Sequence, residues 1–112
     1  MLIAVPVIDG KLSMHFGHCD EFAIVEVDEV KKIVVKTETR KAPAHEPGVL
    51  PKWLGEQGVN VVIAGGMGQR AQTLFQEAGV EVKIGVQGGT VEEIVMAFLE
   101  GQLETGANIC DH

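Results

Sequence analysis

The sequence has 112 residues, of which 46% are hydrophobic, and a formal net charge of −7 at pH 7. This length and composition fit one globular domain and exclude an intrinsically disordered chain. The acidic balance argues against a nucleic-acid partner, which needs a clustered basic face, and against a polybasic membrane contact.

The location of the protein can also be inferred. The chain has no apolar run of roughly 18 residues that could span a membrane. Its apolar start, residues 1–10, lacks the basic segment and cleavage site of a signal peptide. Two cysteines, Cys19 and Cys110, do not make a secreted disulfide framework. We therefore expect a cytoplasmic protein.

The first half of the chain predicts three strands. Residues 2–7 form a continuous apolar run closed by an Asp-Gly pair, which is typical of a central strand and a turn. Residues 22–28 and 32–40 are rich in β-branched residues and partly alternate with polar ones. The short turn between them favours an antiparallel hairpin. Two prolines in residues 42–48 indicate a loop.

The second half alternates helices and strands. Three helices and two strands are predicted, in chain order over residues 49–58 (helix), 59–66 (strand), 68–79 (helix), 80–86 (strand) and 90–103 (helix). The last helix opens with Thr90 and has Glu93 three residues later, which is the capping-box spacing.

The resulting order, β-β-β-α-β-α-β-α, predicts an α/β fold. We expect a mixed sheet of about five strands with helices on both faces, because a βαβ unit needs parallel neighbours while a hairpin is antiparallel. The chain has no internal repeat and no dividing linker. Residues 1–104 are therefore predicted to form a single domain and residues 105–112 a C-terminal tail.

Soft metal ligands gather near both ends of the chain. His15, His18 and Cys19 follow the first predicted strand, and Cys110 and His112 lie in the tail. Thiolate and imidazole suit zinc, copper or iron–sulfur and related clusters. In a sheet of this kind, ligands bind at the carboxyl ends of the parallel strands. If the tail folds back over that edge, the five residues form one metal site; the alternative is that single histidines are ordinary loop residues.

Glycine-rich loops are predicted at the same edge. They contain Gly65, Gly66, Met67 and Gly68 after one strand, and Gly88 and Gly89 after the next. Glycines let the backbone approach an anion, and a following helix supplies unpaired N–H donors. A nicotinamide site is not expected, because the acidic residue of the dinucleotide fingerprint is absent. Either the loops hold a bulky anionic ligand, or Gly66 and Gly68 only make a tight strand-to-helix turn.

An enzymatic role is not favoured. Cys19 beside His15 and His18 could form an activated thiol, but no oxyanion motif or nucleophile elbow accompanies it. The predicted central strands also lack the acids that carboxylate-and-magnesium chemistry needs. We therefore interpret the sequence as that of a binding protein.

Three segments resemble a known family. They are residues 13–28, residues 47–103 and the Cys-Asp-His end, with His-Phe-Gly after the first strand and Gly-Gly-Met-Gly after the strand at 59–66. The segments resemble the dinitrogenase iron–molybdenum cofactor biosynthesis family, the small NifX-like group that is also found fused to NifB proteins. The likeness covers nearly the whole chain.

The resemblance implies a fold and a function. The fold is ribonuclease H-like, with a five-stranded mixed sheet. The function is non-covalent binding or carriage of an iron–molybdenum cofactor, its precursor or a related molybdenum-, iron- or copper-sulfur cluster. The binding residues implied are His15, Phe16 and Gly17, together with the Gly-Gly-Met-Gly motif. Cys19 and the Cys-x-His tail match only part of the family, and nitrogenase assembly itself is not implied.

Partners and alternatives follow from the same resemblance. The partners implied are cofactor-biosynthesis proteins or an ATPase of the MinD type, the type associated with the orange protein of this family. One alternative is a cofactor-free module that regulates such an ATPase. Another is a small zinc protein held by Cys19, Cys110 and histidines.

Overall fold

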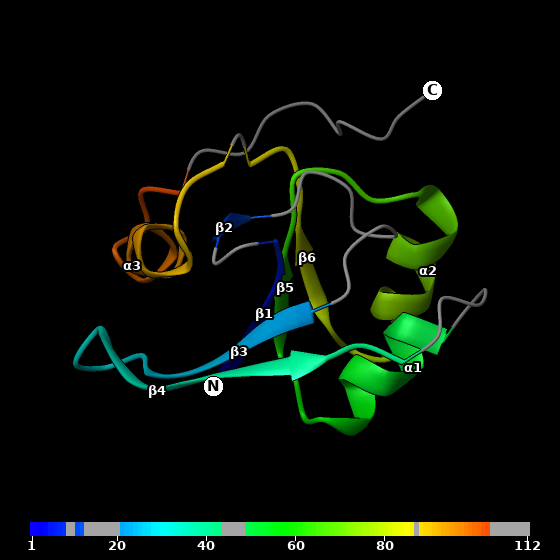
Figure 1. Cartoon of the computed structure of the whole chain (residues 1–112), viewed down its shortest axis with the longest axis horizontal. Helices are drawn as coiled ribbons and strands as arrows, with labels where there is room; N and C mark the ends of the chain where they lie inside the picture. The colour runs from blue at the N-terminus through cyan, green and yellow to red at the C-terminus, as the bar shows by residue number, and fades with distance from the viewer. Residues whose placement is uncertain (9–10, 13–20, 44–48, 87, 104–112) are drawn as a thin grey trace.

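The computed structural model describes residues 1–8, 11–12, 21–43, 49–86 and 88–103. Within these ranges the predicted order of strands and helices is confirmed, with one addition, the two-residue strand β2 (Figure 1). The elements in chain order are β1 (Leu2–Ile8), β2 (Lys11–Leu12), β3 (Glu21–Asp28), β4 (Ile33–Lys41), α1 (Val49–Glu56), β5 (Val61–Ile63), α2 (Gln69–Glu77), β6 (Glu81–Lys83) and α3 (Val91–Leu99).

All the described strands belong to one mixed sheet. Its order is β4-β3-β1-β5-β6, and β2 pairs with the end of β1. The pairs β4–β3, β3–β1 and β1–β2 are antiparallel, whereas β1–β5 and β5–β6 are parallel. The predicted hairpin is thus confirmed. The sheet has six described strands rather than the predicted five, because a strand of two residues is too short to carry a periodic pattern.

The sheet is covered on both faces, as the sequence predicted. Helices α1 and α2 lie on one face and α3 on the other (Figure 1). Strand β3 contributes to both cores because successive side chains of a strand point to opposite faces. Phe22 and Ile24 pack with α1 and α2, whereas Ala23 and Val25 pack with α3. None of the described helices has the length and apolarity needed to cross a membrane.

The predicted capping box at the start of α3 is present. The Thr90 hydroxyl accepts a hydrogen bond from the Glu93 N–H at 3.2 Å, and Glu93 Oε1 accepts one from the Thr90 N–H at 3.1 Å. Glu93 Oε1 also accepts a hydrogen bond from the Thr90 hydroxyl at 2.9 Å, and the two bonds to this carboxylate lower the pKa of Glu93, the backbone bond from Thr90 most strongly. The carboxylate therefore stays ionised beside the positive end of the helix dipole.

Removing this cap is expected to destabilise the protein. A Thr90→Ala variant loses a side-chain acceptor for a helix N–H, which costs about 1 kcal/mol of unfolding free energy. In a domain of this size that corresponds to a melting temperature roughly 4 °C lower. Thermal unfolding measures the effect. Thr73→Ala is the control, because that exposed hydroxyl only donates to a helix carbonyl, that of Gln69; an equal loss in both variants would contradict the role of the cap.

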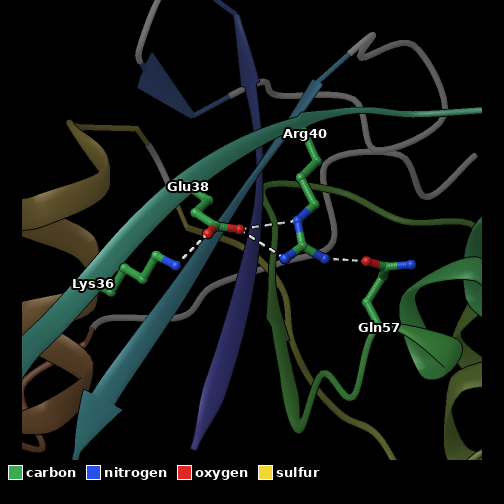
Figure 2. A network of polar contacts seen from close by, with 4 residues as sticks. All are labelled: Lys36, Glu38, Arg40 and Gln57. Atoms are coloured by element: carbon green, nitrogen blue, oxygen red, sulfur yellow. Dashed lines mark hydrogen bonds and ion pairs between the residues drawn. The ribbon is translucent and has the colours of Figure 1, made fainter.

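A polar network lies on one face of β4. Glu38 is bound by Lys36 at 2.6 Å and by Arg40 at 2.7 Å, and Arg40 also donates to the side chain of Gln57 after α1 (Figure 2). The hydrogen bond from Lys36, followed by that from Arg40, lowers the pKa of Glu38 from an ordinary 4.5 to about 2. The network joins the edge strand of the sheet to α1.

The network predicts a pH-dependent stability. Because the pKa of Glu38 is lower in the folded chain, its contribution is fully present above about pH 4.5 and is lost as the pH falls toward 2. The effect is small, since the side chain is 35% exposed. Urea unfolding of the natural chain and of Glu38→Gln is expected to differ more near about pH 6 than near about pH 3. A difference that does not change with pH would contradict it.

Candidate functional site

The carboxyl ends of the three parallel strands β1, β5 and β6 lie at one edge of the sheet. The loops after β5 and β6 are joined directly there. The Gly85 N–H donates to the Gly65 carbonyl at 2.9 Å, and the Ala64 N–H donates to the Lys83 carbonyl, also at 2.9 Å. The structure thus brings the two predicted glycine loops together, as expected for loops that leave neighbouring parallel strands.

The loop after β1 reaches the same edge through β2. The Leu12 N–H donates to the Gly89 carbonyl at 3.1 Å, and Lys11 forms an isolated bridge with Thr90. Leu12 is 7% exposed and packs in the core beneath α3. Main-chain pairing therefore connects the loop after β1 to the loop after β6.

The segment with the predicted histidine and cysteine ligands begins and ends at this edge. It lies between Leu12 and Glu21, and both of these residues are register partners of Val7, near the carboxyl end of β1. Five of the predicted site residues belong to this segment and lie outside the described residues: His15, Phe16, Gly17, His18 and Cys19. What the structure establishes is the position of the two ends of the segment.

The tail residues Cys110 and His112 also lie outside the described residues, which end at Leu103. Leu103 packs against the α3 core and lines a cavity of about 220 Å³ together with Gly88 and Gly89. The described part of the chain therefore ends beside the loop that contains Gly88 and Gly89. The part of the chain that the structure describes contains no histidine or cysteine, and no three of its acidic side chains are grouped closely enough to hold a metal ion.

The Gly-Gly-Met-Gly segment is mostly buried. Gly65 and Gly66 are buried, and the Met67 side chain is 1% exposed within the core between the sheet and helices α1 and α2. The Met67 carbonyl accepts a hydrogen bond from the Gln72 side chain at 3.0 Å. Met67 was predicted as a cofactor contact. Because its side chain fills the core, a contact with a ligand would have to come from the main chain.

Gly68 differs from the other glycines at this edge. It is exposed, and its φ of −64° and ψ of 151° are angles that any residue adopts. A Cβ atom built there would meet no described atom within 4 Å. Gly68 is also the N-cap of α2, a position where Ser, Thr, Asp and Asn are usually preferred. No side chain caps the first N–H groups of this helix. Neither backbone conformation nor packing therefore requires a glycine at this position.

Gly88 and Gly89 have an ordinary structural explanation. Their φ angles are 137° and 119°, which side chains rarely allow. They make the turn that leads into α3, and the Gly89 carbonyl receives the bond from Leu12. Their conformation alone accounts for glycine, so a ligand need not be invoked for them.

The two helices that start at this edge differ in charge. The first turn of α2 has no acidic residue and contains Arg70, whose side chain is exposed. The first turn of α3 contains Glu92 and Glu93 and is closed by the capping box. An anion would therefore be attracted to the uncapped N–H groups of α2 and repelled by α3. Neither Arg70 nor the link through β2 was predicted from the sequence; a basic residue two positions after the glycine motif was the available signal for Arg70.

These features define a class of small α/β proteins with a glycine-rich rim at the carboxyl edge of a mixed sheet. The model of the dinitrogenase iron-molybdenum cofactor family matches residues 1–101, and the chain belongs to this family. The resemblance inferred from the sequence is thus confirmed.

Individual relatives agree with this assignment. An uncharacterized protein of Methanocaldococcus jannaschii is 34% identical over 107 residues, covering 93% of this chain and 90% of that protein. The FeMo cofactor biosynthesis protein NifB of Chlorobaculum tepidum is 29% identical over 105 residues, which are 89% of this chain but 24% of NifB. The apo form of the orange protein from Desulfovibrio gigas has a TM-score of 0.74 and 28% identity, covering 96% of this chain and 93% of that structure.

Proposed function

We propose that this protein binds and carries an iron–molybdenum cofactor, its precursor or a related metal–sulfur cluster as cargo, without catalysing a reaction on it. Membership of the family and the likeness to NifB support a role in cofactor biosynthesis. The observation that carries the proposal is Gly68, a glycine that neither conformation nor packing explains, at the uncapped start of α2. A glycine at a helix N-terminus has no side chain, so a bulky anion can approach the N–H groups of the first turn.

The proposed cargo is held at the carboxyl edge of β1, β5 and β6. Sulfide-rich clusters are anionic, so the N–H groups in the first turn of α2 and the charge of Arg70 favour them. The glycines at 65, 66, 68, 88 and 89 would form the rim. We assign Met67 a main-chain contact at most, since its side chain belongs to the core.

Metal ligation is assigned to the segments that the sequence singled out. His15, His18 and Cys19 supply imidazole and thiolate from the first loop, with Phe16 and Gly17 beside them. Support comes from Leu12 and Glu21, which fix both ends of that loop at the rim. Cys110 and His112 would join from the tail, and Leu103, the last described residue before it, lies beside Gly88 and Gly89. Donors and acceptors of the cargo would be other cofactor-biosynthesis proteins in the cytoplasm.

The decisive experiment is anaerobic purification followed by visible spectroscopy and elemental analysis for Mo, Fe, Cu and Zn. We expect charge-transfer absorption and near-stoichiometric molybdenum or iron, either as isolated or after addition of tetrathiomolybdate or of iron and sulfide. His15→Ala is expected to lower the metal content without lowering the melting temperature, because a loop ligand contributes little to the core.

Two outcomes would overturn the proposal. Zinc alone, with no colour and a melting temperature that falls on chelation, would make the protein a zinc-binding one. A metal-free protein that rejects every cluster but forms a stoichiometric complex with a MinD-type ATPase would make it an interaction module.

A further inference from the structure

Strand β4 forms one edge of the sheet and is the longest of the described strands, with nine residues. Among the described strands only β3 pairs with it, so its outer main-chain groups face away from the sheet (Figure 1). Two large apolar side chains of β4 are exposed, Ile33 at 47% and Val35 at 56%. An edge of this kind is a template for pairing with another strand.

The charges on β4 do not protect the edge in the usual way. Natural sheets often place lysines on an edge strand so that a second copy is repelled. Here Lys36, Glu38 and Arg40 alternate in sign along one face of the strand (Figure 2). An alternating row is repelled by its own copy in some registers and attracted to it in others. The charge pattern therefore selects a register rather than excluding pairing.

The full length of β4 selects the attractive register. Strand Ile33–Lys41 has Thr37 at its centre, so antiparallel pairing of two whole strands puts Thr37 opposite Thr37 of the second copy. Lys36 then stands opposite Glu38 of the second copy, and Glu38 opposite Lys36. These two pairs close a ring of alternating charges with the ion pair that already exists inside each chain.

Neighbouring registers are less favourable. A shift that puts Glu38 on the axis sets Glu38 opposite Glu38, which is repulsive. A shift that puts Thr39 on the axis leaves Ile33 and Val35 outside the paired span. The irregularity in the pairing of β4 with β3, between Glu26 and Val27, leaves Val35 as the extra residue of β4 and lies outside the three central residues, 36–38.

We propose that two copies of this chain associate through β4, in an antiparallel two-fold pairing with Thr37 on the axis. The pairing extends the sheet across both copies and covers the apolar side chains of Ile33 and Val35. It forms at the edge of the sheet away from β5 and β6, so it does not depend on the proposed function. The association is weak and concentration-dependent, because exposed ion pairs contribute little.

Disulfide trapping tests the register. Directly opposite residues of antiparallel strands have Cα atoms roughly 4.5–5.5 Å apart, within the range of a disulfide. In a chain whose Cys19 and Cys110 are replaced by serine, Thr37→Cys is expected to yield a disulfide-linked dimer on mild oxidation, several-fold faster than the matched Thr39→Cys. Equal rates, no dimer, or a preference for Thr39→Cys would overturn the proposal.

Charge reversal tests the attraction in the chain with its natural cysteines under reducing conditions. Sedimentation over rising protein concentrations is expected to detect a dimer for the natural chain. Lys36→Glu is expected to shift the protein to monomer, because the introduced carboxylate would face Glu38 of the second copy. The double variant Lys36→Glu with Glu38→Lys restores opposite charges and is expected to recover the dimer. A natural chain that stays monomeric, or a double variant no better than the single one, would overturn the proposal.

Discussion

An aspartate in place of Gly68 is expected to stabilise the cargo-free protein and, at the same time, to weaken cargo binding. Gly68 is the N-cap of α2 and has the extended backbone that capping residues adopt, with open space around a Cβ atom. An aspartate there can accept hydrogen bonds from the first N–H groups of the helix and complements its dipole. We expect a gain of roughly 0.5 kcal/mol in unfolding free energy.

The same carboxylate competes with the proposed cargo. It occupies the N–H groups that an anionic cluster would use and adds a negative charge beside them. We expect at least about a tenfold loss of cluster affinity, which corresponds to about 1.4 kcal/mol. Urea unfolding of the metal-free protein measures the first effect, and a cluster titration followed by visible absorption measures the second.

Two control variants make this test specific. Gly68→Ser caps the helix without a charge, so it separates steric obstruction from electrostatic repulsion. Gly79→Ala lies at the other end of α2, where φ is +78°, and is expected to lower stability by about 1 kcal/mol without changing affinity in the folded protein. If Gly68→Asp bound the cluster as tightly as the natural chain, the start of α2 would not be part of the site.

The sequence predicted the strands and helices well because burial leaves a pattern, but it did not predict their ends. The predicted strand 59–66 is longer than β5, Val61–Ile63, since Val59 and Ala64 are buried without belonging to the paired strand. The last helix was predicted to reach residue 103 but ends at Leu99. Gly101, which has a φ of +73°, was a signal in the sequence for the end of this helix. Leu103 fits the apolar pattern of the helix because it packs against the same core, although it lies beyond the helix end.

The candidate site was partly predictable for a different reason. Loops that follow parallel strands meet at one edge by topology, so the meeting of the Gly65 and Gly85 loops could be expected. The bond from Leu12 to Gly89 could not, because β2 is too short to have a pattern. The sequence alone also does not distinguish Gly89, where the positive φ requires a glycine, from Gly68, where the backbone conformation does not require one. The ribonuclease H-like classification of the fold stays a prediction.

Phe75→Ala is expected to have the largest effect on stability of any single change proposed for this chain. Phe75 is the only fully buried side chain of α2, with an exposed fraction of 0%, and it packs in the core that α1 and α2 share with the sheet. Replacing a buried phenylalanine by alanine removes apolar contacts and leaves a cavity, which costs about 3–5 kcal/mol. That is a large fraction of the stability of a small domain.

The same variant connects the core to the proposed site. Phe75 is the buried side chain of helix α2, whose first turn follows Gly68, and it packs in the same core as Met67. We therefore expect Phe75→Ala to lower the urea midpoint strongly and to reduce cluster binding even under conditions where the chain is folded. Gln76→Ala, at an exposed neighbouring position, is the matched control and is expected to change neither. A loss below about 1 kcal/mol for Phe75→Ala would mean that α2 is held by its loops rather than by this side chain, and binding should then be unaffected.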